Sequence, residues 1–167
     1  MSARSKTQER RVARFFGTER TPLSGGASRH TRSDTLHPKL YIEVKSAIGP
    51  GGTNGWLWRE IRDMEPHQHS MTYYCCDHIY IAHTDTVEVN RHYVTAVRGS
   101  VKAACLRLWK QTVELAAQEK KTPLLALLVK GKRGFWLVSD AEGILAAQKA
   151  RKEVVDGEAT EQHGGDL

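Results

Sequence analysis

The sequence is poor in cysteine and has no long apolar stretch. Its 167 residues include three cysteines, two of them adjacent. An odd number in that arrangement does not support a disulfide framework and is typical of a reducing compartment. The longest apolar run, Leu124–Val129, is far shorter than the roughly 20 residues that a membrane-spanning helix needs. The basic N-terminal residues are not followed by the apolar core of a signal peptide, so we expect a cytoplasmic, intracellular protein with no membrane partner.

Acidic residues are scarce in the first third of the chain. The protein carries 25 Lys and Arg against 19 Asp and Glu, a net charge of +6, and residues 1–48 account for this entire excess. A concentrated basic region attracts polyphosphate backbones, because binding releases condensed counterions. The charge pattern makes nucleic acid a candidate partner, with a solvated basic surface as the alternative.

Hydrophobic periodicity predicts a single α/β domain. Helices are expected over 7–17 (capped by Thr7), 101–120 and 140–152. Strands are expected over 18–22, 39–45, 124–129 and 135–138, with a hairpin formed by His78–His83 and Thr86–Val97 that turns near Thr84–Asp85. This order predicts a mixed central β-sheet flanked by helices, followed by a disordered polar tail over 153–167.

Glu43 and Lys45 lie at the end of one expected strand and point to the same face, because side chains alternate along a strand. Leu40, Ile42 and Val44 take the opposite face into the core. A carboxylate can hold Mg²⁺ through oxygen, and an ammonium group beside it can orient a water molecule or stabilise charge on a phosphate. A surface salt bridge is the alternative reading of a Glu-x-Lys triplet.

Two further acids belong to the same pattern. Asp34 lies before a turn at His37–Lys39 that would return the chain and bring Asp34 alongside Glu43. Glu9 lies on the apolar stripe of the first helix, where a carboxylate is costly unless it is paired or metal-bound; a solvated position at a frayed helix end is the alternative. Carboxylates beside one lysine predict a metal site for phosphodiester cleavage.

The order of these motifs resembles the PD-(D/E)XK nuclease superfamily, most of all its archaeal-type Holliday junction resolvases and related phage nucleases. The similarity covers residues 7–48 and 101–139. It is carried by Glu9 in the opening helix, Thr21-Pro22-Leu23-Ser24-Gly25-Gly26, Asp34, and Leu40-Tyr41-Ile42-Glu43-Val44-Lys45. Ser33 precedes Asp34 where the family has proline, and residues 49–100 stand where the simple resolvases have a short connection.

The resemblance implies a Mg²⁺-dependent DNA endonuclease, with Mn²⁺ able to substitute, that acts as a homodimer or higher homo-oligomer. It implies a restriction-endonuclease-like core over 1–48 and 101–152. Carried over by position, it implies Asp34, Glu43 and the Val44 carbonyl as metal ligands, Lys45 and Glu9 as further catalytic residues, and Ser24 as a phosphate contact. Arg29 and Arg32, which flank the glycine loop, are additional expected DNA contacts.

Residues 49–100 form the expected insertion, which is rich in aromatic and apolar side chains and close to neutral. That composition suits a subunit interface better than a phosphate surface, and capping of the chain's own core is the alternative. The candidate interface anchors are Trp56, Trp58, Tyr73, Tyr74 and Tyr80.

Histidines and cysteines between residues 67 and 83 do not have the spacing of a structural zinc site, which favours buried or interfacial roles for them. They are His67, His69, Cys75, Cys76, His78 and His83.

A junction-selective endonuclease is the leading hypothesis, and three alternatives stay open. The first is a sequence-specific restriction or homing endonuclease that uses residues 49–100 to read base edges. The second is a non-catalytic DNA-binding protein that kept the fold. The third is a zinc-stabilised interaction module centred on residues 67–83.

Overall fold

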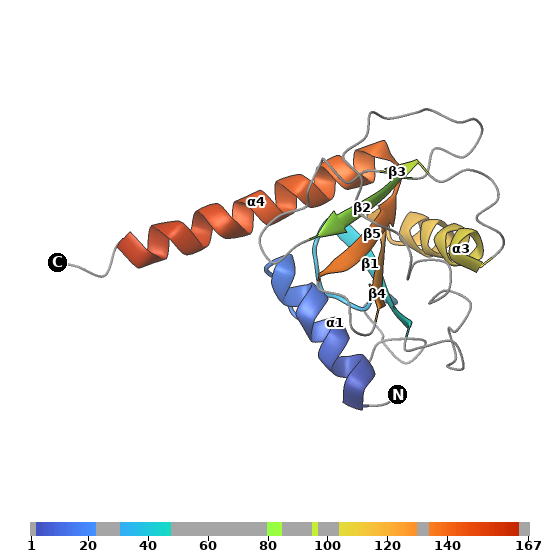
Figure 1. Cartoon of the computed structure of the whole chain (residues 1–167), viewed down its shortest axis with the longest axis horizontal. Coiled ribbons are helices and arrows are strands. Elements are labelled where there is room, and N and C mark those ends of the chain that lie inside the picture. Colours follow the sequence, from blue (N-terminus) through green and yellow to red (C-terminus); the bar gives the residue numbers. More distant parts are fainter. Residues whose placement is uncertain are drawn as a thin grey trace.

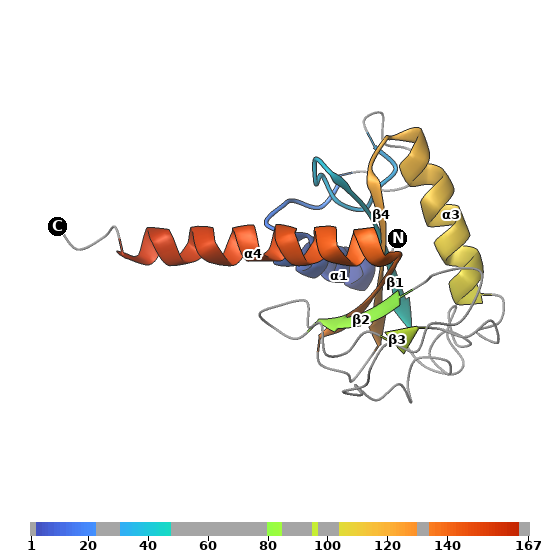
Figure 2. The ribbon, with the colours of Figure 1, turned by 90° about the horizontal axis from the view of Figure 1, so that it is seen from above.

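The computed structural model describes residues 3–22, 31–47, 80–84, 95–96, 104–129 and 134–163. The described strands form one five-stranded mixed sheet with helices on both faces (Figures 1 and 2). This confirms the expected α/β class. The strands are β1 (Leu40–Ala47), β2 (Tyr80–Thr84), β3 (Thr95–Ala96), β4 (Thr122–Val129) and β5 (Phe135–Ser139). The helices are α1 (Ala3–Phe15), α3 (Ala104–Gln118) and α4 (Ala141–His163).

The strand order across the sheet is β1-β4-β5-β2-β3. β1 and β4 are parallel over their whole length, from Leu40 opposite Thr122 to Ala47 opposite Val129. The other neighbouring pairs are antiparallel. Because β4 is interior and both its faces are covered, its apolar run 124–128 is buried throughout.

The two faces of the sheet are covered by different helices (Figure 2). Leu40, Ile42 and Val44 of β1 join a core cluster with residues of α1 and α4. On the opposite face α3 packs against β4 and β1, and Trp109 of α3 is buried. Strand alternation therefore directs the odd-numbered side chains of β1, including Glu43, toward the face that α3 covers.

α1 ends in a turn that fits closely against α4. Gly17 has a φ of 62°, and the N–H of Thr18 bonds to the carbonyl of Ala13 at 3.0 Å, which closes the helix end. A Cβ atom at Gly17 would lie 2.5 Å from the Val154 side chain of α4. Arg151 of α4 donates to the last α1 carbonyl and lies 4.6 Å from the centre of the Phe15 ring. These contacts hold α4 against α1 at the expected helix end, residue 152, and two residues past it.

The predicted disordered tail is wrong over 153–163, because α4 continues to His163. Its last turns project from the body of the molecule (Figures 1 and 2). Good helix formers such as Glu158, Ala159 and Glu161 continue the helix once Arg151 and Val154 anchor it. Residues 164–167 lie outside the described part of the chain.

Two local predictions near the N-terminus are wrong. α1 begins at Ala3, so Thr7 lies inside the helix and does not cap it. The expected strand over 18–22 is reduced to one isolated antiparallel bridge between Arg20 and Thr35.

Part of the expected insertion belongs to the central sheet. β2 pairs with β5 from Tyr80 opposite Ser139 to Thr84 opposite Phe135, and it pairs with β3 on its other side. The antiparallel pair confirms the expected partners of the hairpin. However, Ile81 is opposite Thr95, so the turn at Thr84–Asp85 is wrong and the connection spans 85–94. The remainder of 49–100 lies outside the described residues.

Among the described residues, no helix combines the length and the apolar character that crossing a membrane requires.

Candidate active site

Glu43 and Lys45 form an ion pair on the face of β1 that points toward α3. Their side chains are partly buried, with 19% and 31% exposed respectively. The pair follows directly from strand alternation, because residues two apart project to the same side of a strand. The structure therefore places the Glu43 carboxylate and the Lys45 ammonium group together, as expected.

Asp34 is clamped to the free edge of β1. Its N–H donates to the carbonyl of Ile42 at 2.9 Å, and its Oδ2 accepts the N–H of Val44 at 2.8 Å. The intervening turn is held by His37, whose Nδ1 accepts the N–H groups of Lys39 and Leu40. The chain reversal predicted at 37–39 thus brings Asp34 alongside the strand that carries Glu43.

Ser33 fixes the backbone next to Asp34 through its hydroxyl. Its hydroxyl accepts the N–H of Ile42 at 3.0 Å and donates to the carbonyl of Ile42 at 3.2 Å. It also accepts the N–H of Thr35. One side chain therefore ties the backbone around Asp34 to the edge of β1.

Glu9 of α1 is buried, with 3% of its surface exposed. It accepts a hydrogen bond from Ser5 and forms an ion pair with Arg20 at 3.2 Å. The alternative of a solvated residue at a frayed helix end is wrong. The burial is tolerable because the carboxylate is paired. Sequence reasoning missed Arg20, whose only signal was its place in the arginine-rich N-terminal region.

The electrostatics tie these groups into one acidic cluster, which we define as Glu9, Asp34 and Glu43 with Lys45. The pKa of Asp34 is raised from 3.8 to about 7, first by burial and then by the negative charge of Glu43, while the N–H of Val44 partly opposes the rise. Glu9 adds to the rise. Burial lowers the pKa of Lys45, but Glu43, Asp34 and Glu9 outweigh it and hold that pKa above its ordinary value.

Tyr41 lies on β1, on the same face as Glu43 and Lys45, and was also missed. It is fully buried, and within the described part of the chain its hydroxyl has no hydrogen-bond partner. Burial, followed by the charges of Glu43, Glu119 and Asp34, raises its pKa. The phenol therefore stays neutral beside these charges.

Glu119, after the end of α3, anchors the segment that leads to Asp34. Its carboxylate accepts the hydroxyl of Thr31 and the N–H of Arg32, and it pairs with Lys121 at 3.1 Å. Burial raises the pKa of Glu119, but these hydrogen bonds and the charge of Lys121 outweigh it and hold the pKa below its ordinary value. Nothing in the sequence signalled this contact, because the bonded residues lie far apart in the chain.

The donor set fits a hard divalent cation. Asp34 and Glu43 supply carboxylate oxygens, and burial, followed by the negative charge of Glu43, raises the pKa of Asp34. The carbonyl of Val44 points to the same edge as its N–H, toward Asp34. Within the described ranges, no three His, Cys, Asp or Glu side chains form a metal-holding group by themselves. Mg²⁺ suits such a site, since it takes one or two carboxylates and completes its shell with water and phosphate.

The remaining predicted site residues divide into two groups. Arg32 is exposed, beside the Glu119 anchor. Ser24 and Arg29 lie outside the described residues, as do the expected anchors Trp56, Trp58, Tyr73 and Tyr74. The zinc candidates from His67 to His78 also lie outside them, and His83 falls within β2.

Comparisons with protein-family models, with curated proteins and with solved structures found no match to this chain.

Proposed function

We propose that this protein is a Mg²⁺-dependent endonuclease that hydrolyses phosphodiester bonds in DNA, with a restriction-endonuclease-like core of the PD-(D/E)XK type. The observation that carries the proposal is the backbone clamp that holds the Asp34 carboxylate beside Glu43 and Lys45. Two carboxylates and a lysine at one strand are the groups that metal-assisted phosphodiester hydrolysis requires.

Asp34, Glu43 and the carbonyl of Val44 would hold the cation. When bound, Mg²⁺ would neutralise charge on the phosphate and lower the pKa of a coordinated water. In the hydrolysis a water oxygen bonds to phosphorus, one phosphorus–oxygen ester bond breaks, and the leaving oxygen takes up a proton. Lys45 stays protonated beside Glu43, so it can donate hydrogen bonds to the attacking water or to a phosphate oxygen.

Glu9 holds Arg20 in an ion pair, and its negative charge acts on Asp34. Its role in the proposal is to strengthen cation binding by the field of a buried carboxylate, in addition to any direct contact with the cation. The buried side chain of Tyr41 contributes by excluding water from the face of β1 that carries Glu43 and Lys45.

A branched DNA junction is the substrate we propose, on the strength of the resemblance in motif order. Symmetric cutting of a junction needs two active sites related by a two-fold axis, so we propose a homodimer. The contact between subunits through residues 49–100 stays a prediction. The cytoplasmic location expected from the sequence stays a prediction.

The test is cleavage of matched four-way junction, linear duplex and single-stranded DNA in Mg²⁺, with Mn²⁺ in a parallel series. We expect the wild-type protein to cut the junction in preference to the duplex. Asp34→Asn, Glu43→Gln and Lys45→Ala should each lower the cleavage rate by at least about 100-fold. DNA binding in EDTA should survive in all three, because phosphate contacts supply most of the affinity.

Glu114→Gln in α3 is the matched control. Glu114 is exposed, and its replacement removes one negative charge, as Asp34→Asn and Glu43→Gln do. This control should cut DNA at the wild-type rate. Wild-type activity in Asp34→Asn or Glu43→Gln would contradict the site. Equal cutting of one sequence in junction and duplex would favour the sequence-specific alternative, and binding without cleavage of any DNA would favour the non-catalytic one.

A further inference from the structure

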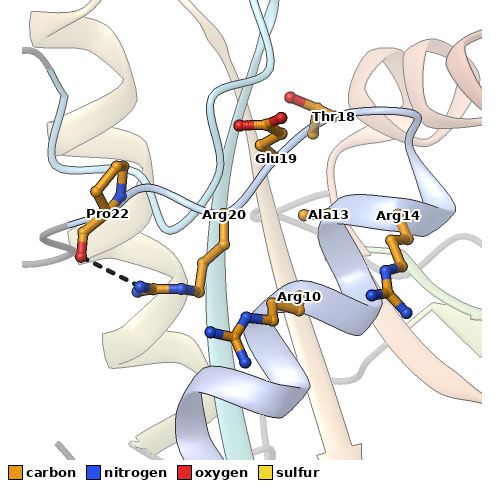
Figure 3. A pocket seen from close by; sticks show the side chains of 7 residues that line it. All are labelled: Arg10, Ala13, Arg14, Thr18, Glu19, Arg20 and Pro22. Carbon is orange, nitrogen blue, oxygen red and sulfur yellow. Dashed lines mark hydrogen bonds between the residues drawn. The ribbon is translucent and has the colours of Figure 1, made fainter.

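A basic cavity of about 360 Å³ opens between the second half of α1 and the segment 18–22 (Figure 3). Three of the residues that line it are arginines. Arg10 and Arg14 extend from one side of α1, one turn apart, and Arg20 faces α1 from the segment that follows it (Figure 3). The cavity is therefore a concave surface whose cationic groups come from two separate elements.

The positive charge of this cavity is only partly offset. Arg20 already pairs with Glu9 and donates to the carbonyl of Pro22. In the part of the chain that the structure describes, Arg10 and Arg14 form neither an ion pair nor a hydrogen bond. Glu19 also lines the cavity, but its carboxylate points away from Arg10 and Arg14 (Figure 3). Two exposed guanidinium groups thus stand at one rim with open donors.

The cavity adjoins the acidic cluster through a shared ion pair. Glu9 and Arg10 are neighbours on α1, but Glu9 turns inward and is buried, whereas Arg10 is exposed. Arg20 joins the two, because it lines the cavity and its Nη1 lies 3.2 Å from Glu9. The cavity and the acidic cluster therefore meet at one Arg–Glu pair. A nucleic-acid strand, which carries phosphates at a regular spacing, can engage both.

We propose that this cavity binds a backbone phosphate of the DNA strand at a position outside the phosphodiester that is cut. The proposal rests on the proposed function, since that function makes DNA the partner. Guanidinium groups present paired N–H donors that match two phosphate oxygens, so Arg10 and Arg14 can together hold one phosphate at this rim. A free polyphosphate offers the same chemistry, and the experiment separates the two.

The experiment measures equilibrium binding to a four-way junction in EDTA over a series of salt concentrations. The proteins are the wild type, the double variant Arg10→Gln/Arg14→Gln, and the control Lys149→Gln/Lys152→Gln in α4. All four substituted side chains are exposed, and both variants lose the same charge. We expect the Arg10→Gln/Arg14→Gln protein to bind about tenfold more weakly, with a log–log salt slope smaller by about 0.9, the value for one phosphate. An equal loss in the control would overturn the proposal.

A second measurement identifies the phosphate. Junctions that carry one neutral methylphosphonate at successive positions are bound to the wild type and to the Arg10→Gln/Arg14→Gln protein. At the phosphate held in the cavity, the neutral group should weaken wild-type binding and leave the variant unaffected. If every position weakens both proteins equally, the proposal is wrong. If the substitutions weaken binding of inorganic tripolyphosphate but not of DNA, the cavity binds free polyphosphate and the assignment to DNA is overturned.

Failure of this proposal is distinguishable from failure of the nuclease proposal, because binding is read without a divalent cation and without cleavage. A protein that binds DNA through the cavity but cuts none of the tested DNAs contradicts the nuclease activity alone. A wild type that cuts DNA, with the Arg10→Gln/Arg14→Gln protein binding like the control, contradicts the cavity alone. A wild type that does not bind DNA overturns both.

Discussion

Replacing Asp34 with asparagine tests the acidic cluster through stability and needs no enzymatic activity. Asparagine has the same shape, and its side-chain oxygen can still accept the N–H of Val44, but it carries no charge. Burial and the charge of Glu43 raise the pKa of Asp34 from 3.8 to about 7, so the charged carboxylate destabilises the folded protein. Without a cation, Asp34→Asn should therefore be more stable than the wild type above that pKa.

The sign follows from proton binding. Between about pH 4 and pH 7 the folded protein retains a proton on Asp34 that the unfolded chain has released, so wild-type stability falls as the pH rises through this range. Each pKa unit corresponds to about 1.4 kcal/mol, so the charged Asp34 lowers the free energy of unfolding by at most about 4 kcal/mol. Water that enters the charged site reduces this cost. We expect the free energy of unfolding of Asp34→Asn to exceed that of the wild type by about 2–4 kcal/mol at pH 8 and by less than about 1 kcal/mol at pH 4.

The assay is urea denaturation of both proteins in EDTA at pH 4 and pH 8, repeated at pH 8 with Mg²⁺. Mg²⁺ should stabilise the wild type and leave Asp34→Asn unchanged, because only the wild type has the full donor set. Asp156→Asn, at an exposed position of α4, is the matched control and should show no pH-dependent advantage. If Asp34→Asn is no more stable than the wild type at pH 8 in EDTA, or if its advantage is equal at the two pH values, the electrostatic reasoning is refuted.

Three further outcomes follow from named contacts and are read by thermal or urea unfolding. Gly17→Ala should lower the free energy of unfolding by about 1–3 kcal/mol, because the φ of Gly17 is 62° and the new Cβ would lie 2.5 Å from Val154 of α4. The control Gly157→Ala, whose Cβ meets open space, should raise it by about 0.5–1 kcal/mol, and equal effects would contradict the close packing. Arg20→Gln should lose about 2 kcal/mol by leaving Glu9 buried without its cation, and a neutral result would show that this pair is not needed. Glu119→Gln should lose about 1 kcal/mol and weaken Mg²⁺ stabilisation by loosening the segment before Asp34; unchanged Mg²⁺ stabilisation would contradict that link.

The parts of the fold and site that were predictable are those encoded over a few neighbouring residues. The alternation from Leu40 to Lys45 predicted both the strand and the shared face of Glu43 and Lys45, because the period of a strand is a local property. The apolar run at 124–129 predicted a strand covered on both faces, and β4 is that strand. The turn at 37–39 predicted the approach of Asp34, since only a short reversal separates it from β1.

By itself, then, the sequence determined where β1, β4, β5 and α3 lie and which side chains share a strand face, because both depend on spacing along the chain. Only the tertiary structure decided what those segments meet. In that structure β2 pairs with β5, and α4 continues past Val154, which packs against Gly17. Arg20 pairs with Glu9, and Glu119 bonds to Thr31, 88 residues away in the sequence. The physical reason is that each of these contacts depends on the packing of distant segments, and local periodicity carries no information about such packing.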